Sequence, residues 1–380
     1  MGYLDYNATT PLAPEALEAM LPFLRSEYGN ASSIHAHGRR ARAAIDDARD
    51  RLAALMGVRP HEIIFTSGGT ESVNLGVIGL ALARAGKGRH LITAATEHHA
   101  VLEAAAYLQR QHGFEITTLG VDPGGRIDPE TLQAAIRPDT VLVSIMSANN
   151  ETGVLQPLDA ISTICRERGV LLHSDMVQSF GKQPIKPHQM GLAAVSIAAH
   201  KFYGPKGSGA LFLRAGEPLV PSLHGGSHEN QRRAGTENVA AIVGMAAAAE
   251  AVLADLDREQ EREAALRDWL WEAIQKVAPR AIRNGTPAHV LANTLNISFP
   301  GADGETLLIG LDMEGIAVSS GSACMVGSVQ PSHVLLAMGV PPEVAQATVR
   351  FSIGRQTKKE NLEFAVAGLT KVLERQETPA

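Results

Sequence analysis

The sequence has 380 residues, of which 45% are hydrophobic, and its formal net charge is −6. The length predicts about two domains, and the acidic balance provides no basic surface for nucleic acid. Two cysteines without CxxC spacing argue against a disulfide scaffold or a metal site and fit a reducing cytoplasm. The N-terminus shows no signal segment, and Glu250 interrupts the apolar stretch 239–256, which we interpret as a buried helix rather than a membrane span.

Short β-rich runs alternate with helical patterns through the first part of the chain. These runs lie at 63–66, 91–93, 115–119, 141–145, 170–173, 195–198 and 210–213. Such alternation predicts an α/β fold with a mostly parallel, doubly wound, seven-stranded sheet. The charged helical stretch 255–267 then leads to a smaller α/β domain. We expect a large domain at 14–258 and a small domain made of 1–13 and 259–380.

A glycine-rich turn follows the first β-rich run. The segment 66–72 (TSGGTES) separates that run from a helical pattern. Backbone N–H groups at a helix N-terminus, together with the Thr70 hydroxyl, can hold a phosphate dianion. Gly69 and Thr70 are therefore candidate phosphate ligands, although the same pattern is also ordinary turn chemistry. The segment matches neither the Walker nor the dinucleotide pattern, which disfavours a nucleotide.

His98 stands at the next strand-to-helix turn, in the segment 96–101 (TEHHAV). An imidazole at this position could stack on a cofactor ring and transfer protons near neutral pH. A single histidine is more often a structural residue. The interpretation of His98 therefore depends on the motifs around it.

The strand-like run 170–174 ends in Asp175, and Gln178 follows three residues later. In a parallel sheet, ligands gather at the carboxyl ends of the strands. A carboxylate there could pair with the pyridinium nitrogen of pyridoxal phosphate, and Gln178 could donate to the phenolate oxygen of the ring. A helix-capping role is the structural alternative for Asp175.

Lys201 follows the apolar run 195–199 and precedes the turn 203–207 (YGPKG). An amine that is partly desolvated at a strand end can form a Schiff base with the aldehyde of pyridoxal phosphate. The alternative is a surface lysine that begins a loop, because lysine is mostly exposed in proteins. The spacing from Asp175 to Lys201 suits one further strand between them.

The two cysteines have different surroundings. Cys324 follows glycine, serine and alanine in the segment 319–324 (SSGSAC), a composition that favours a mobile loop. Cys165 lies in a helical pattern, and we expect it to be a small core residue. Taken alone, Cys324 could equally be a free surface thiol.

Over nearly its whole length the chain resembles the cysteine desulfurases of the NifS/IscS group. The resemblance rests on motifs at 3–10 (YLDYNATT), 29–35 (GNASSIH), 319–324 (SSGSAC), 330–333 (QPSH) and 349–355 (VRFSIGR). It implies the aminotransferase-like fold, pyridoxal phosphate as cofactor, and L-cysteine as substrate. The expected products are alanine and a Cys324 persulfide, whose sulfur passes to an acceptor protein for iron–sulfur clusters or other sulfur-containing products.

The resemblance also implies roles for individual residues. Lys201 holds the cofactor and removes the substrate Cα proton, Cys324 accepts the sulfur, and His98 stacks on the ring. Arg350 and Asn150 bind the substrate, and Asn150 also orients the ring oxygen. The other expected cofactor ligands are Gly69, Thr70, Asp175, Gln178, His200 and, from the second subunit of a homodimer, Thr236.

Three places depart from the commonest pattern of that group. Ala198 replaces a phosphate-binding serine, Met176-Val177 replaces small residues, and Met325-Val326 replaces a Thr-Ser pair. Two other functions stay open from the residues. A selenocysteine lyase or aminotransferase of the same fold would keep Lys201 and Asp175 without depending on Cys324. A non-catalytic sulfur scaffold would tolerate the loss of Lys201.

Overall fold

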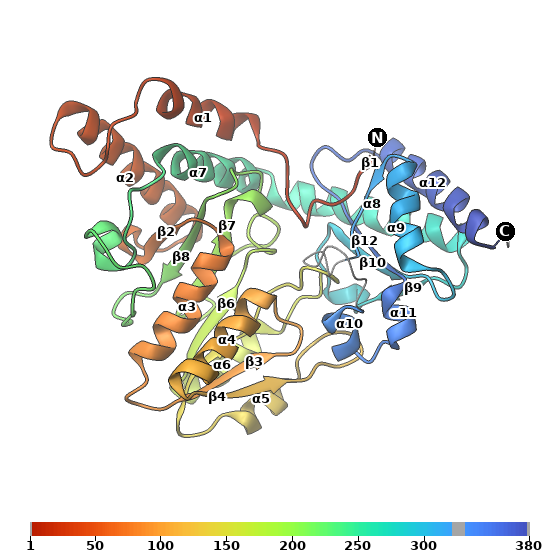
Figure 1. The fold of residues 1–380 in the computed structure, drawn as a ribbon, viewed down its shortest axis with the longest axis horizontal. Helices are drawn as coiled ribbons and strands as arrows, with labels where there is room; N and C mark the ends of the chain where they lie inside the picture. The colour runs from red at the N-terminus through yellow and green to blue at the C-terminus, as the bar shows by residue number, and fades with distance from the viewer. Residues whose placement is uncertain (1, 321–330, 378–380) are drawn as a thin grey trace.

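The computed structural model describes residues 2–320 and 331–377 (Figure 1). Its main sheet has seven strands in the order β2-β8-β7-β6-β5-β3-β4. All neighbouring pairs are parallel except those of β8, which runs antiparallel to β7 and to β2. The strands are β2 (Ile63–Thr66), β3 (His90–Ala94), β4 (Glu115–Leu119), β5 (Thr140–Ser144), β6 (Leu171–Asp175), β7 (Ala194–Ala198) and β8 (Gly209–Leu213). The predicted mostly parallel, seven-stranded sheet is confirmed.

Helices cover both faces of this sheet. One face packs against α3 (Gly69–Ala83) and α4 (His99–His112) in a single apolar core. The other face packs against α2 (Ala36–Met56), α5 (Pro129–Ala135), α6 (Leu158–Glu167) and α7 (Val239–Ala254), with α1 (Pro14–Arg25) lying on α7. Strands buried on both faces read as continuous apolar runs, which is why their positions could be predicted from the sequence.

The alanine-rich helix α7 is buried along most of its length, from Ala240 to Ala249. Small side chains allow close packing against α1 and α2. The predicted buried helix is therefore confirmed. None of the helices among the described residues has both the length and the apolar character that a membrane span requires. One pair passes that test together, α7 with α8 (Leu256–Val277), but the two are bent by 71°.

A second apolar core includes one face of α8. It is built on an antiparallel sheet of order β12-β10-β9, packed against α8, α9 (Gly304–Met313) and α12 (Lys359–Glu377). The strands are β9 (Ile282–Asn284), β10 (Thr294–Ser298) and β12 (Thr348–Ser352). Near it lie α10 (His333–Ala337) and α11 (Pro342–Gln346), and the short helices are η1 (Pro60–Glu62), η2 (Ala199–Lys201), η3 (His228–Gln231) and η4 (Pro287–His289). The domain boundaries at 14 and 258 stay a prediction.

The N-terminal segment joins the two cores. β1 (Gly2–Tyr3) pairs in parallel with β11 (Ile316–Ala317), beside the second core. The chain then passes to the main sheet, where the Thr10 amide donates to the carbonyl of His200. Between these points the Asn7 amide donates to Ser352 Oγ at 2.9 Å. Residues 4–10 therefore lie against the end of η2, where Lys201 stands.

Candidate active site

A cavity of about 320 Å³ lies at the carboxyl edge of the main sheet. Five strands of parallel direction deliver residues to it, because the turns that follow β2, β3, β5, β6 and β7 meet at one edge. Nine of the residues predicted from the sequence line this cavity, namely Gly69, Thr70, His98, Asn150, Asp175, Gln178, His200, Lys201 and Arg350. The structure thus brings together groups that are up to 281 positions apart, from Gly69 to Arg350.

Lys201 closes the short helix η2 directly after β7. Its Nζ donates to the carbonyl oxygen of Asn7 at 2.6 Å and to that of Ala8 at 2.8 Å. The amine therefore lies between the cavity and the N-terminal segment, in a defined position. As predicted, one strand, β7, separates Lys201 from Asp175.

Asp175 is the last residue of β6, and its side chain is almost completely buried. Its Oδ1 accepts a hydrogen bond from the Val177 amide at 2.9 Å. Burial raises the pKa of this carboxyl. Positive charge on His98 or Lys201 acts in the opposite direction and lowers the pKa. A buried carboxylate is stabilised by a cationic N–H donor. The site therefore suits a ligand that brings a protonated ring nitrogen to Asp175.

His98 is the N-cap of α4, and its Nδ1 accepts from the Ala100 amide at 3.0 Å. Burial lowers the pKa of the imidazole, so His98 is neutral near pH 7. With Nδ1 as the acceptor, the proton of the neutral ring is on Nε2. His98 can therefore present an N–H and a flat ring to the cavity.

The N-terminus of α3 forms another wall of the cavity. A Cβ on Gly69 would lie 3.0 Å from Val177 Cγ2 and 3.2 Å from the Ala198 Cβ, so a side chain there would force these neighbours to shift. The first N–H groups of a helix bind anions when such close approach is possible. Burial lowers the pKa of the neighbouring His200 to about 4, so its imidazole is neutral. This end of the cavity fits a phosphate group.

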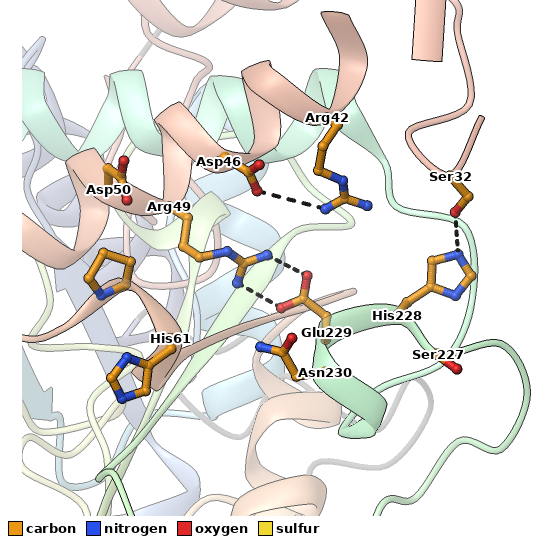
Figure 2. Close-up of a pocket in the computed structure, with 11 residues that line it drawn as sticks. Ser32, Arg42, Asp46, Arg49, Asp50, His61, Ser227, His228, Glu229 and Asn230 are labelled. Carbon is orange, nitrogen blue, oxygen red and sulfur yellow. Dashed lines mark hydrogen bonds and ion pairs between the residues drawn. The ribbon is translucent and has the colours of Figure 1, made fainter. Parts of the chain in front are cut away.

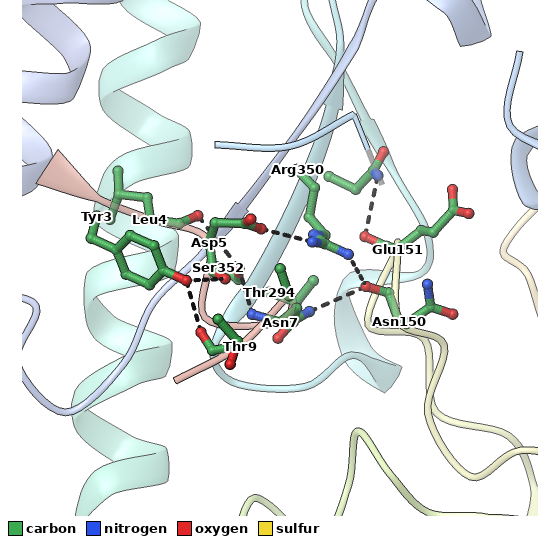
Figure 3. Close-up of polar contacts among 12 residues, drawn as sticks. Tyr3, Leu4, Asp5, Asn7, Thr9, Asn150, Glu151, Thr294, Arg350 and Ser352 are labelled. Carbon is green, nitrogen blue, oxygen red and sulfur yellow. Dashed lines mark hydrogen bonds and ion pairs between the residues drawn. The ribbon is translucent and has the colours of Figure 1, made fainter. Parts of the chain in front are cut away.

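Arg350, on β12, brings a guanidinium group to the cavity, and Figure 3 shows its contacts with Asp5 and Asn150. Its Nη2 donates to Asp5 Oδ1 at 2.7 Å and its Nη1 to the Asn150 carbonyl oxygen at 2.8 Å. The Nε of Arg350 is buried and has no hydrogen-bond partner among the residues that the structure describes. Arginine pairs well with carboxylates through parallel N–H donors. The group is thus fixed in place with donor capacity left for an anion.

The sequence interpretation missed Asn7 as part of the site. Its carbonyl oxygen accepts from Lys201 and, at 2.9 Å, from Gln178 Nε2. Its side chain donates to Asn150 and Thr294, as Figure 3 shows. Its position in the motif 3–10 was the available signal, but the sequence does not indicate contacts across nearly two hundred positions. Gln178 Nε2, which we expected to donate to the ring oxygen of the cofactor, therefore donates to Asn7 in this structure.

The two remaining residues predicted for the site are Thr236 and Cys324. Thr236 is exposed and does not line the cavity. Cys324 lies outside the described residues, as does the pair Met325-Val326. The other cysteine, Cys165, lies on the buried face of α6, and burial raises the pKa of its thiol to about 12. The prediction of Cys165 as a core residue is confirmed.

A second hollow, of about 570 Å³, lies between α2 and the segment that contains η3 (Figure 2). Arg49 pairs with Glu229 through two hydrogen bonds of 2.8 and 2.6 Å, and His228 contacts Ser32. Glu229, Asn230 and Gln231 all have positive φ angles, between 49° and 64°. Three such residues in succession are costly for the backbone, and such strain is concentrated at functional segments.

The chain matches known proteins along its whole length. The sequence profile of the family Aminotransferase class-V matches residues 2–364. A protein named cysteine desulfurase IscS, from Dictyoglomus turgidum, is 48% identical over 99% of this chain and 95% of its own length. A solved structure of a NifS-like protein superposes with a TM-score of 0.93 at 36% identity, covering 99% of this chain and 100% of that one. The structure of SspA in complex with cysteine gives 0.82 at 35% identity, over 93% and 99%.

These matches agree with the resemblance seen in the motifs and with the cavity that holds Lys201 and Asp175. Enzymes of the class-V family use pyridoxal phosphate, and the amine, the buried carboxylate and the helix N-terminus of this cavity fit that cofactor. The chain belongs to the pyridoxal-phosphate-dependent Aminotransferase class-V family, in which it groups with the cysteine desulfurases.

Proposed function

We propose that this protein is a cysteine desulfurase. In the reaction, the Cβ–S bond of L-cysteine breaks, its sulfur joins the thiolate sulfur of an enzyme cysteine, and the organic part leaves as L-alanine. L-cysteine and a protein thiol thus give L-alanine and a protein persulfide, with atoms and electrons balanced. The observation that carries the proposal is the cavity that joins Lys201, Asp175 and Arg350, in a chain 48% identical to a cysteine desulfurase over 99% of its length.

Lys201 and Asp175 are the residues that we assign to the cofactor's reacting parts. When bound, pyridoxal phosphate supplies an aldehyde for the amino group of the substrate and a ring that accepts electrons from the adjacent carbon. Lys201 Nζ holds the aldehyde before the substrate arrives and takes the substrate Cα proton afterwards. Asp175 keeps the ring nitrogen protonated, and Gly69, Thr70 and His200 hold the phosphate.

Arg350 and Asn150 are the residues that we assign to the substrate. The guanidinium group binds the substrate carboxylate with the donors that Asp5 and Asn150 leave available. His98 stacks on the ring, and its Nε2–H serves proton transfer to the leaving group. Val177 packs at the same wall of the cavity as Gly69.

Cys324 is the sulfur acceptor in this proposal, although it lies outside the described residues. The only other cysteine in the sequence is Cys165. Its raised pKa and buried position make a thiolate there unfavourable. The persulfide is then drawn off by an acceptor protein, and the IscS name of the relatives favours iron–sulfur cluster assembly as the destination. With only two cysteines, we place the protein in the reducing cytoplasm.

The test is alanine release from L-cysteine by the purified holoprotein, with the persulfide sought by mass spectrometry of the peptide that contains residue 324. We expect both signals in the wild-type protein and in Cys165→Ala, and neither in Cys324→Ala. Alanine release by Cys324→Ala at the wild-type rate would contradict the proposed acceptor. A holoprotein that releases no alanine from L-cysteine, but acts on selenocysteine or transfers its amino group, would instead support one of the alternative reactions.

We further propose that the protein works as a homodimer with Thr236 from one subunit at the cavity of the other. The strained segment 229–231 and the exposed position of Thr236 support this arrangement. Lys201→Ala and Thr236→Ala should each have low activity alone. Mixed dimers of the two contain one cavity with both native residues, so mixing after mild dissociation should restore activity. Failure of the mixture, with dimers formed, would contradict the shared site.

A further inference from the structure

Lys201 borders two cavities rather than one. Besides the cavity of the candidate active site, it lines a small cavity of about 20 Å³ on the side of α8. Lys182, Tyr203 and Glu263 line this second cavity as well. The ionisable groups of Lys182 and Glu263, which none of the assigned roles uses, therefore lie behind the proposed catalytic lysine.

Lys182 is linked to Lys201 indirectly, through hydrogen bonds to Asn7 and Gln178. Lys182 Nζ donates to Asn7 Oδ1 at 3.2 Å and to Gln178 Oε1 at 3.0 Å. Gln178 Nε2 in turn donates to the Asn7 carbonyl oxygen, which is also the acceptor for Lys201 Nζ at 2.6 Å. Lys182 therefore fixes both side chains that surround this carbonyl.

Glu263, on α8, supplies the opposite charge. Its side chain is buried, with 8% of the residue exposed. Burial lowers the pKa of Lys182 to about 7 and raises the pKa of Glu263 to about 7, and each shift is opposed by the charge of the other residue. The other charged groups that act on the pair are Lys201, Arg350, Glu259, Arg262 and Arg355. The backbone of Lys182 is also held, because its carbonyl oxygen accepts from Gln260 of α8.

We propose that Lys182 is a positioning residue for Lys201, with its ammonium group balanced by Glu263 and holding Asn7 and Gln178 in register. The charge matters as well as the hydrogen bonds, because a cation behind Lys201 disfavours a second positive charge at the Lys201 nitrogen. The inference rests on the proposed function only in assuming that Lys201 carries the cofactor. A neutral residue of similar length would leave Gln178 Oε1 without its Lys182 donor, while Asn7 Oδ1 would keep only the donor Asn293 Nδ2.

The test compares Lys182→Met with Lys182→Arg in the holoprotein. The exposed Lys186, whose Nζ donates to Leu55 on the surface, supplies the control Lys186→Met. The first readout is the pH midpoint of the cofactor absorbance band. It should rise by about one pH unit in Lys182→Met and stay unchanged in Lys186→Met. The second is turnover of L-cysteine, where kcat should fall about 10-fold with little change in KM.

Lys182→Arg should keep the wild-type midpoint and recover most of kcat, because it restores the charge. In addition, Glu263→Gln should lower kcat in the wild-type background and have little further effect in Lys182→Met. A Lys182→Met protein with the wild-type midpoint and kcat would overturn the proposal. If Lys182→Met does not fold, a wild-type kcat in Glu263→Gln would overturn the proposal. A failure of the desulfurase assignment is separate, since the absorbance midpoint reads the Lys201 environment without any substrate.

Discussion

Asp5 and Arg350 form an ion pair that joins the N-terminal segment to the last strand of the second core. The Arg350 Nη2 lies 2.7 Å from Asp5 Oδ1, and the arginine is only 3% exposed. A buried guanidinium needs a paired charge to offset the loss of hydration. The arginine that we propose binds the substrate is therefore held in place by the protein itself, and Asp5 occupies one of its donors.

Asp5→Asn tests this arrangement. The amide oxygen can still accept a hydrogen bond, but it no longer balances the arginine charge or fixes its orientation as firmly. We expect KM for L-cysteine to rise about 10-fold, with kcat within about twofold of the wild type. Asp303→Asn, which changes the N-cap of α9 in the second core, is the control and should leave KM unchanged. An unchanged KM in Asp5→Asn would mean that Asp5 contributes nothing to substrate binding.

Gly69→Ala tests the phosphate end of the cavity. The new methyl group would meet Val177 Cγ2 at 3.0 Å, so that either Val177 or the helix N-terminus must shift. We expect the apoprotein to bind pyridoxal phosphate at least about 10-fold more weakly, as measured by equilibrium titration of its absorbance, because the N–H groups move away from the phosphate.

Val177→Ala supplies the matched rescue. In the double variant the methyl group of residue 69 no longer meets Val177 Cγ2 and only the tight contact with the Ala198 Cβ stays, so cofactor affinity should recover in part relative to Gly69→Ala alone. If the double variant binds the cofactor as weakly as Gly69→Ala, the loss would come from the helix N-terminus itself rather than from the contact with Val177.

Much of this site could be predicted because its signals are local. Gly69, His98 and Asp175 each stand where a strand gives way to a turn or helix, and the strand pattern was clear because these strands are buried on both faces. Parallel strands then bring their carboxyl ends to one edge, so three short motifs imply one site.

The contacts that hold the site together could not be predicted in the same way. Asn7 and Lys201 are 194 positions apart, and Asp5 and Arg350 are 345 apart. Their meeting depends on how the N-terminal segment runs between the two cores, which no local pattern indicates. The role of Lys182 could not be predicted either, because a lysine in a loop is mostly exposed and only the tertiary structure shows which residues surround its amine.

His98 has a structural role and, in the proposed mechanism, a chemical one, and two substitutions can separate them. As the N-cap of α4, its Nδ1 satisfies the Ala100 amide, and loss of such a cap costs about 1 kcal/mol. His98→Ala should therefore lose both stability and turnover. His98→Asn should recover the stability, because asparagine is a good N-cap, while turnover stays low without the imidazole. Urea unfolding and alanine release measure the two effects. Full activity in His98→Asn would contradict the proposed proton transfer.

The charged form of Asp175 should lower the stability of the apoprotein as the pH rises, although the same charge favours cofactor binding. The pKa of Asp175 is raised above the ordinary value of 3.8, chiefly by burial, so the folded apoprotein holds the proton more tightly than the unfolded chain does. Stability linked to this group is therefore present at low pH and is lost as the pH rises from about 3.8 through the raised pKa. Each unit of the shift corresponds to about 1.4 kcal/mol.

Asp175→Asn removes this charge while keeping the shape of the side chain. In thermal melts of the apoprotein between about pH 4 and pH 8, the variant should gain stability relative to the wild type as the pH rises. Its affinity for pyridoxal phosphate should fall at least about 10-fold, because the ring nitrogen loses its carboxylate partner. Asp159→Asn, on the exposed side of α6, should change neither quantity. A stability difference that does not grow with pH would contradict the buried, uncompensated carboxylate, and undiminished cofactor affinity would contradict its pairing with the ring.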